Sequence, residues 1–558
     1  MTIHSRTASP PELEGAPDLC LSGQPLSIDD VHRIAARRQS IGIANDPDLR
    51  ERLRRSEDLV TDAVNAGEKV YGITTGFGSM ADVAVPSGEV AASQVNLLSF
   101  LSCSAGRPLP DVDVRAAMLL RANMLLKGTS GIRPELIERL VLFLNEGATP
   151  VVGELGSIGA SGDLVPLAVI ARAISGQAAP CRIRHGEIEV DGHDFLAALG
   201  CEPLILRPKE ALAIVNGTSF SAAIAANCLH AAKGHFSLAL GAHALMIVAL
   251  LGHDDPFDSF VHAAKPHPGQ RWVAEQMRYL LGERPGSDES ERSHLQDRYS
   301  IRCLPQYLGP IAEGLVRITR TVETEMNAVT DNPLVDCEGE RFLQSGNFLG
   351  QYVGMAMDDL RRYLALIAKH LDTQIALLVA PEFNHGLPGS LAGDPDSPVG
   401  ITLKGLQIAG NSIVPQMTHL ANPLVEHFPT HAEHFNQNIN GLSWGSSILA
   451  RQSIELSAHY AAISSLFAVQ AIDLRARRSH GHHDGRVLLT QALLPFYESV
   501  YAIAGRIPGE STPLVDDSCD RPLETIQRDL ASSIDENDAM VGSLSFLADR
   551  LTEAAPGD

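Results

Sequence analysis

Residues 353–379 read VGMAMDDLRRYLALIAKHLDTQIALLV, a stretch in which apolar side chains recur at spacings of three and four residues. These apolar positions are Met357, Leu360, Leu364, Ile367, Leu371, Ile375 and Leu378. Such spacing places them on one face of an α-helix, because a helix turns once every ~3.6 residues. The predicted helix is longer than an average one, and its apolar face needs neighbouring helices to cover it. The stretch therefore predicts a helical bundle.

Similar apolar patterns extend this bundle along the chain. Long apolar-rich helices are predicted from Pro208 onward and near 401–420 and 445–474, while proline and glycine mark a loop at 381–400. Aromatic residues make up only 5% of the chain, and alanine and leucine are abundant, which favours helix over sheet. The predicted fold class is mainly α, with a long central helical bundle and an N-terminal mixed, mostly helical domain.

Four segments describe the expected domain organisation. Residues 1–23 are rich in Ser, Pro and Glu and are expected to be disordered. Residues 24–207 are expected to form the N-terminal domain, residues 208–475 the central helical bundle, and residues 476–558 a C-terminal helical region.

The N-terminal domain contains recognisable element boundaries. Ser27 and Asp30 have the spacing of a capping box, which predicts the start of a helix. A second helix is predicted from Pro47, with Gly67 as its stop. The alternating stretch at 181–190 predicts a β-hairpin.

Charge and cysteine usage exclude several classes of function. Acidic residues outnumber basic ones by 67 to 44, which gives a net charge of −23 at pH 7. Such a surface repels phosphate backbones, so nucleic acid is not expected as a partner. The eight cysteines are scattered without a Cys-x-x-Cys pair, which gives no zinc spacing and suits a reducing cytoplasm. We find no apolar core of a signal peptide, and the apolar stretch 236–251 is short for a membrane span and predicts a buried helix. A cytoplasmic protein without membrane contact is expected.

The stretch 153–167, GELGSIGASGDLVPL, carries the strongest indication of chemistry. By composition it is a tight glycine-rich turn that leads into a helix, with Asp163 and Pro166 suited to the first turn. No Lys-Ser/Thr follows the glycines and no strand-then-acid pattern accompanies them. A nucleotide-binding loop is therefore not indicated.

Within this stretch, Gly156–Leu167 resembles the signature of the aromatic amino acid ammonia-lyases and aminomutases. In that family the inner Ala-Ser-Gly cyclises into 4-methylideneimidazol-5-one (MIO). The resemblance implies that Ala160, Ser161 and Gly162 form this group here. The Gly162 nitrogen would attack the Ala160 carbonyl, and loss of the Ser161 hydroxyl as water would leave a methylene electrophile. The start of the following helix would place positive dipole ends beside the ring. The N-terminal domain would thus carry the MIO loop, and the resemblance is closest to phenylalanine ammonia-lyases of bacterial length.

Other residues that match the family lie between Tyr71 and Gln437. Tyr71, in YGITTGFG, matches the catalytic base, and its ordinary pKa of about 10 must shift for action at neutral pH. Arg302, in QDRYSIRCLPQ, matches a residue that grips the substrate carboxylate through two parallel hydrogen bonds. The resemblance places Tyr299 near MIO, where it would assist the amine or the proton transfer.

Polar residues around the substrate are also implied. Asn216 and Asn347 match residues near MIO and the substrate carboxylate. Glu433, Asn436 and Gln437 lie in HAEHFNQN, and the spacing of Glu433 and Gln437 predicts one helical face directed toward the amine. The flanking histidines do not form the His-Glu-x-x-His pattern of zinc enzymes, so no metal is expected.

Phe100 and Leu101 match the pair that holds the aromatic ring of the substrate. In the family that the chain resembles, a Phe-Leu pair is typical of enzymes that act on phenylalanine. A His-Leu pair accompanies activity on tyrosine, and a Ser-His pair is typical of enzymes that act on histidine. A phenyl wall would leave a tyrosine hydroxyl without a partner, at a cost of about 1–3 kcal/mol. Lys404, in LKGLQ, also fits the phenylalanine type.

Together these matches imply a phenylalanine ammonia-lyase that converts L-phenylalanine to trans-cinnamate and ammonia. An aromatic amino acid 2,3-aminomutase shares every residue named, and a tyrosine ammonia-lyase is an alternative that Phe100 disfavours. A non-catalytic helical scaffold would not need the Ala-Ser-Gly stretch. The resemblance also implies a small aromatic amino acid as substrate, MIO as the cofactor without metal or nucleotide, and a homotetramer whose active sites combine loops of different subunits.

Overall fold

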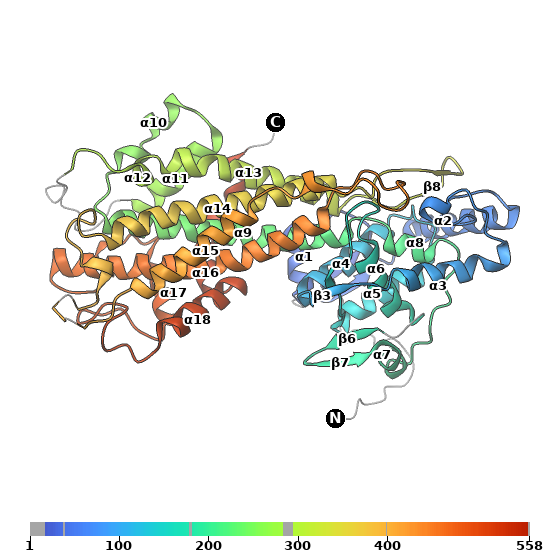
Figure 1. The fold of residues 1–558 in the computed structure, drawn as a ribbon, viewed down its shortest axis with the longest axis horizontal. Coiled ribbons are helices and arrows are strands. Elements are labelled where there is room, and N and C mark those ends of the chain that lie inside the picture. Colours follow the sequence, from blue (N-terminus) through green and yellow to red (C-terminus); the bar gives the residue numbers. More distant parts are fainter. Residues whose placement is uncertain are drawn as a thin grey trace. The chain divides into compact units, whose positions relative to one another are not determined.

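The computed structural model describes residues 17–36, 39–177, 181–282, 294–394, 396–397 and 399–555, and Figure 1 labels many of its elements. The chain forms two compact units, each assembled from three separate segments. The first unit comprises Met1–Asn227, Arg320–Asp358 and Pro423–Ile448, and the second Cys228–Thr319, Asp359–Asn422 and Leu449–Asp558. The expected boundaries at 23, 207 and 475 stay predictions, because the two units are defined by contacts and not by continuous sequence.

The sequence predicts disorder over residues 1–23. Residues 1–16 lie outside the described residues, whereas Leu19–Leu21 form strand β1. This strand pairs in parallel with β2 (Ile41–Ile43), and Leu21 is buried. Burial of one apolar side chain and pairing with a strand 22 residues further along the chain order this part of the segment. A count of Ser, Pro and Glu does not reveal either interaction.

Within its described residues the first unit is mostly helical, with four small β-sheets. The helices that lie wholly in this unit are α1 (Ile28–Ala35), α2 (Pro47–Ala66), α3 (Val90–Phe100), α4 (Asp111–Leu125), α5 (Pro134–Asn145), α6 (Leu164–Ser175), α7 (Gly192–Ala198) and α8 (Glu210–Val215). Besides β1 with β2, the paired strands are β3 (Ala105–Pro108) with β5 (Gly153–Leu155), β4 (Ala148–Pro150) with β6 (Arg182–His185), β6 with β7 (Ile188–Asp191), and β8 (Leu334–Asp336) with β9 (Arg341–Leu343). Its 3-10 turns are η1 (Gly78–Met80), η2 (Ser87–Glu89) and η6 (Val425–His427).

Local sequence explains the boundaries of several of these elements. Ser27 caps α1, and Asp30 bonds back to the cap backbone, so the predicted capping box is confirmed. Helix α2 has Pro47 in its first turn and ends at Gly67, whose φ of 67° is left-handed. The predicted hairpin at 181–190 is confirmed by the antiparallel pairing of β6 with β7.

The second unit contains only helices and 3-10 turns among its described elements. The helices wholly in this unit are α10 (Ser259–Ala264), α11 (Pro268–Leu281), α12 (Tyr299–Arg302), α15 (Lys404–Leu420), α17 (Leu494–Ile503), α18 (Leu523–Asp535), α19 (Ala539–Gly542) and α20 (Ser545–Asp549). Its 3-10 turns are η3 (Asp255–Phe257), η5 (Gly389–Leu391), η7 (Gly485–Leu488) and η8 (Leu551–Ala554). Four longer helices carry residues of both units: α9 (Ser219–Ala249), α13 (Leu304–Met326), α14 (Gln351–Val379) and α16 (Ser443–His480).

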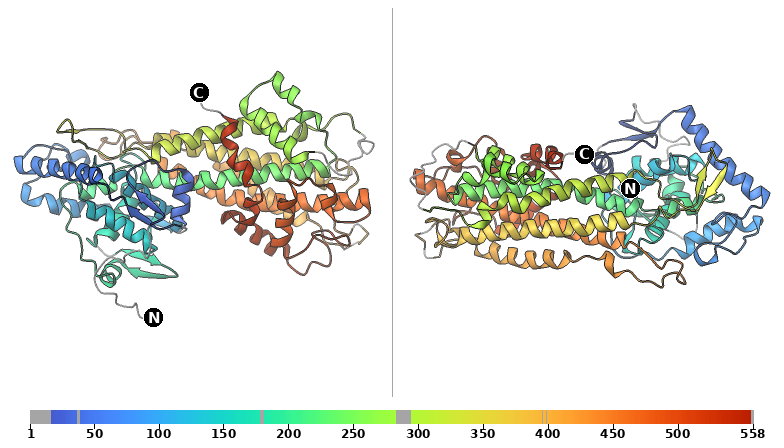
Figure 2. Two further views of the ribbon diagram at one scale, coloured as in Figure 1. Left: turned by 180° about the vertical axis from the view of Figure 1, so that it is seen from behind. Right: turned by 90° about the horizontal axis from the view of Figure 1, so that it is seen from above.

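In the second unit the long helices run alongside one another as a bundle (Figure 2). All seven apolar side chains that predicted the helix at 353–379 are buried in α14, with none more than 5% exposed. Polar bonds cross between the helices as well. The Tyr460 hydroxyl of α16 donates to the Asp372 carboxylate of α14 at 3.1 Å, and the Arg475 Nε donates to the Ala249 carbonyl of α9 at 2.7 Å. The predicted helical bundle is confirmed.

Helix α9 lies deep in the fold. It is the one described helix long and apolar enough to cross a membrane, and 89% of its most apolar window is buried by other parts of the chain. A core helix that is apolar on all sides has this composition. The predicted buried helix at 236–251 corresponds to the second half of α9.

Candidate active site

The Ala160–Ser161–Gly162 stretch lies in the loop between β5 and α6. Gly159 and Gly162 have φ values of 65° and 71°, in the left-handed region that disfavours side chains. A Cβ at Gly162 would lie 2.0 Å from the carbonyl oxygen of Gly217. Both the backbone conformation and the available space therefore require glycine at position 162.

Backbone bonds from distant segments hold this loop in place. The Asp163 N–H donates to the Gly217 carbonyl at 2.8 Å, and the Leu442 N–H donates to the Ile158 carbonyl at 3.0 Å. These partners come from the turn before α9 and from the residue before α16. The shape of the loop therefore depends on tertiary contacts within the first unit and not on its own sequence alone.

Three donors converge on Ser161. The Asn216 Nδ2 donates to the Ser161 carbonyl oxygen at 2.9 Å, and the Gly217 N–H donates to the same oxygen at 3.3 Å. The Gln437 Nε2 donates to the Ser161 hydroxyl oxygen at 2.9 Å. The structure thus brings together Ser161, Asn216 and Gln437, which the sequence placed in one site.

Buried charged side chains lie close to Ser161 and Asn216. The Arg121 guanidinium is fully buried and donates to the Asn216 carbonyl at 2.9 Å. Burial lowers the pKa of Arg121 to about 10, although Asp331 and Asp163 oppose that shift. Burial raises the pKa of Asp163 to about 6, even though its carboxylate accepts a backbone N–H of α9 at 2.7 Å. The Lys209 ammonium pairs with the Asp331 carboxylate at 2.7 Å, and both side chains are fully buried.

Tyr71 lies beside η1 in the first unit. Its hydroxyl oxygen accepts the Gly78 N–H at 3.0 Å, while the Glu433 carboxylate accepts the Ser79 N–H at 2.7 Å. Burial raises the pKa of Tyr71, the charge of Glu433 adds to that rise, and the Gly78 bond opposes it. Within this chain the pKa moves in the direction opposite to the one that base catalysis at neutral pH requires.

The segment that carries Glu433 and Gln437 is a turn, so the prediction of one helical face is wrong. Glu433, His434 and Phe435 have φ values of 51°, 53° and 65°, and the Gln437 N–H closes the turn on the Ala432 carbonyl at 3.2 Å. Left-handed backbone costs roughly 1–2 kcal/mol for each residue with a side chain. Bonds from the turn to the Ser161 hydroxyl and to η1 offset that cost, and residue spacing cannot report them.

Four further predicted residues lie in the first unit. Phe100 ends α3 and is 59% exposed, whereas Leu101 is buried. Asn347 is exposed, and its Nδ2 donates to a backbone carbonyl at 3.2 Å. Asn436 is exposed within the left-handed turn. A pocket wall made of Phe100 needs a covering surface, because more than half of this residue faces outward.

The remaining predicted residues belong to the second unit. Tyr299 and Arg302 begin and end α12, and the guanidinium carbon of Arg302 lies 4.8 Å from the centre of the Tyr299 ring. The Arg302 Nη1 donates to the Gln296 side chain at 3.0 Å. Tyr299 is 71% exposed, and Lys404, the first residue of α15, is exposed as well.

Comparison with known families decides the class of this protein. The model of the family described as aromatic amino acid lyase matches residues 26–494. The chain belongs to the aromatic amino acid lyase family. The sequence-based prediction of a carbon–nitrogen lyase is therefore confirmed.

Known members of the aromatic amino acid lyase family resemble the chain over most of its length. A phenylalanine ammonia-lyase of Nostoc punctiforme is 48% identical over 489 residues, which cover 86% of each chain. An aromatic ammonia-lyase of Loktanella atrilutea is 42% identical over 542 residues, covering 96% of this chain and 99% of the relative. The solved phenylalanine aminomutase of Pantoea agglomerans has a TM-score of 0.83 at 27% identity, covering 93% of this chain and 98% of that one. The predicted fold is confirmed by this likeness.

Sequence reasoning missed two residues of this lyase, one that bonds to Ser161 and one that bonds to its partner Asn216. Gly217 provides a backbone donor to the Ser161 carbonyl oxygen, and Arg121 holds the carbonyl of Asn216. In the Asn-Gly pair at 216–217, the family resemblance points to the asparagine only. Arg121 lies in an ordinary helical pattern within α4, so its sequence context offers no indication of a role.

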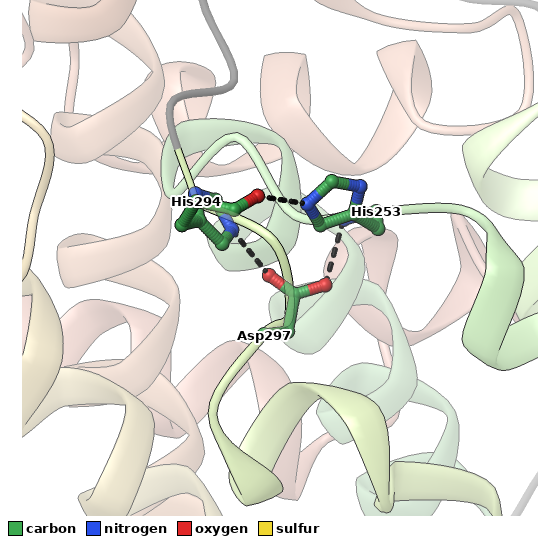
Figure 3. Close-up of side chains that lie close together, drawn as sticks. All are labelled: His253, His294 and Asp297. Atoms are coloured by element: carbon green, nitrogen blue, oxygen red, sulfur yellow. Dashed lines mark hydrogen bonds and ion pairs between the residues drawn. The ribbon is translucent and has the colours of Figure 1, made fainter.

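The lyase also contains a cluster of potential metal ligands that the sequence did not indicate: His253, His294 and Asp297, whose ligand atoms lie within 4.8 Å of one another (Figure 3). The His294 Nε2 bonds to the Asp297 carboxylate at 2.9 Å, and the His253 Nε2 bonds to the His294 carbonyl at 2.9 Å. The Asp297 carboxylate also accepts the His253 backbone N–H at 2.7 Å. These bonds account for the proximity of the three residues without an ion.

Proposed function

We propose that this lyase is a phenylalanine ammonia-lyase, which converts L-phenylalanine to trans-cinnamate and ammonia. The observation that carries the proposal is the intact Ala160–Ser161–Gly162 loop with donors on both oxygens of Ser161. The Nostoc punctiforme relative named phenylalanine ammonia-lyase supports it at 48% identity. Phe100 favours phenylalanine over tyrosine, because a phenyl ring offers no partner to a substrate hydroxyl.

The cofactor of the proposed reaction is MIO, formed from Ala160, Ser161 and Gly162. Attack of the Gly162 nitrogen on the Ala160 carbonyl releases one water, and loss of the Ser161 hydroxyl releases a second. The left-handed, side-chain-free Gly162 fits this compressed backbone, since a Cβ there would meet Gly217 at 2.0 Å. When formed, MIO supplies an electrophilic methylene carbon conjugated to the Ser161 carbonyl. Neither metal nor nucleotide is part of the proposal.

Asn216 and Gly217 have a direct electrostatic role in this proposal. Their N–H groups donate to the Ser161 carbonyl oxygen, where they stabilise negative charge. Arg121 keeps Asn216 in place through its carbonyl. The Gln437 amide contacts the Ser161 hydroxyl that leaves as water.

Tyr71 takes the β-proton of the substrate, and the Gly78 N–H stabilises the phenolate that this role requires. Arg302 binds the α-carboxylate with two parallel hydrogen bonds, and its stacking on the Tyr299 ring limits the freedom of its side chain. The other proposed substrate contacts are Phe100, Leu101, Asn347, Lys404, Glu433 and Asn436.

The proposed assembly is a homotetramer whose active sites combine residues of different subunits. Support comes from two proposed site residues with large aromatic side chains, Phe100 and Tyr299, which are 59% and 71% exposed in a single chain. Sedimentation equilibrium of the purified protein is expected to give four times the mass of the chain. A monomer with full activity would contradict the shared site.

The proposed location is the cytoplasm. All eight cysteines lie in the described part of the chain, and each is a free thiol there. Free thiols in this number suit a reducing compartment.

Purified protein supplied with L-phenylalanine is expected to form trans-cinnamate, followed by its ultraviolet absorbance. Parallel reactions with L-tyrosine and L-histidine should proceed at least about tenfold more slowly, because a buried hydroxyl or imidazole would lack partners beside Phe100. Equal rates with tyrosine would contradict the assigned ring pocket. Accumulation of β-phenylalanine, detected by chiral chromatography, would instead identify an aminomutase, the activity named for the similar Pantoea agglomerans structure.

A further inference from the structure

We propose that Gln374 is a positioning residue for the carboxylate-binding segment Tyr299–Arg302, an inference that rests on the proposed role of Arg302. Gln374 lies on α14 in the second unit and is fully buried. Its Nε2 donates to the Ser300 carbonyl oxygen at 2.7 Å. Ser300 stands between Tyr299 and Arg302, so this bond holds the backbone that carries both side chains.

Helix α12 needs such an anchor because it is only four residues long. A helix of one turn leaves most of its carbonyl groups without a partner inside the helix. Ser300 and Ile301 are buried, and a buried carbonyl without a partner costs free energy. The Gln374 amide supplies the missing donor from a long helix of the bundle.

The Ser300 carbonyl sets the orientation of the Gln374 amide, and two buried histidines continue the chain of hydrogen bonds beyond it. The Ser300 carbonyl can only accept, so Nε2 faces it and Oε1 faces the His243 Nδ1 at 3.0 Å. The His243 Nδ1 must then carry the proton, and its Nε2 accepts from the His370 Nδ1 at 3.2 Å. Burial lowers the pKa of His243 well below its ordinary value, so this ring stays neutral. Each hydrogen bond in this chain is therefore donated in the direction from His370 toward Ser300.

A second anchor, Asp297, fixes the backbone just before the same segment. The Asp297 carboxylate accepts the His253 backbone N–H at 2.7 Å and bonds to the His294 Nε2 at 2.9 Å (Figure 3). Asp297 and Ser300 are thus both tied to the body of the second unit. Tyr299 nevertheless remains 71% exposed. Rigid backbone beneath exposed side chains is the arrangement that a precise carboxylate contact needs.

A methionine in place of Gln374 tests the role of the amide, because it has nearly the same length and cannot donate to Ser300. Gln470→Met is the matched control. Gln470 is also a fully buried glutamine of the second unit, but its Nε2 donates to the carbonyls of Leu391 and Val515, at 3.2 and 2.9 Å. Both full-length variants are titrated calorimetrically with trans-cinnamate, which has a ring and a carboxylate, and with 2-phenylethylamine, which has a ring and an amine.

Gln374→Met is expected to weaken trans-cinnamate binding by at least about tenfold and to change 2-phenylethylamine binding by less than about twofold. Gln470→Met should leave both affinities within about twofold of wild type, even where its melting temperature falls. A general loss of packing would weaken the binding of both ligands together, and that result would overturn the positioning role. Wild-type affinity for trans-cinnamate in folded Gln374→Met would overturn it as well.

Gln374→Asn provides a second test if the methionine variant does not fold. It keeps a buried amide but shortens its reach by one methylene, so it cannot bridge His243 and Ser300. The same selective loss of trans-cinnamate affinity is expected. If the wild-type protein neither binds trans-cinnamate nor converts L-phenylalanine, both the proposed function and this inference are wrong. If the wild-type protein is active but the Gln374 variants lose affinity for both ligands equally, only this inference is wrong.

Discussion

Replacement of Ser161 by alanine is expected to lower kcat/KM for L-phenylalanine by at least about 10³-fold, or ~4 kcal/mol of transition-state stabilisation. Alanine has no hydroxyl to lose as water, so the proposed electrophilic methylene cannot form. The substitution removes the bond from the Gln437 Nε2, and its cost to stability should be about 1 kcal/mol because Ser161 is partly exposed. Cinnamate formation and thermal unfolding of the same preparation measure the two effects.

Ser175→Ala is the matched control for this experiment. Ser175 is buried at the end of α6, and its hydroxyl donates to the Arg172 carbonyl, away from the Ala-Ser-Gly loop. This variant should keep wild-type activity. Intact mass provides an independent reading, since the wild-type protein should weigh less than its sequence by two water molecules. An unmodified wild-type mass, or full activity in Ser161→Ala, would refute the electrophile.

The helical fold could be predicted because the information for it is local. Every apolar residue that defined the helix at 353–379 is buried in α14, and a repeat of three and four residues suffices to show the buried face. The cap at Ser27 and the stop at Gly67 depend on side chains and backbone conformations within a few residues. The two compact units could not be predicted, because each joins segments separated by long stretches of chain.

The same distinction between local and distant information applies to the candidate site. Resemblance named Ser161 and Gln437, but the bond between them spans 276 residues, and no local pattern specifies it. The turn at Glu433 shows why spacing failed there. Its left-handed backbone is held by contacts with η1 and with the Ser161 loop, and those contacts outweigh the local preference for right-handed helix.

Replacement of Tyr71 by phenylalanine is expected to lower kcat by about 10²–10⁴-fold while KM changes little, because the variant loses the proposed proton acceptor and keeps the ring. The oxygen removed is the one that accepts the Gly78 N–H at 3.0 Å. Tyr363→Phe is the control. Its hydroxyl is bonded by Arg317 at 3.1 Å in the second unit, outside the proposed site, so its loss should leave kcat nearly unchanged.

The pH dependence of the rate separates a base at position 71 from a residue that only packs. Burial and the nearby Glu433 carboxylate raise the pKa of Tyr71 above its ordinary value, and a tyrosine acts as a base only after it loses its proton. A raised pKa places the rising limb of the wild-type profile on the alkaline side, so kcat/KM should increase with pH through the neutral and mildly alkaline range. In Tyr71→Phe this limb should be absent and the residual rate flat over the same range. If the variant keeps the wild-type limb, another group removes the β-proton, and Tyr71 serves only to shape the loop above the substrate.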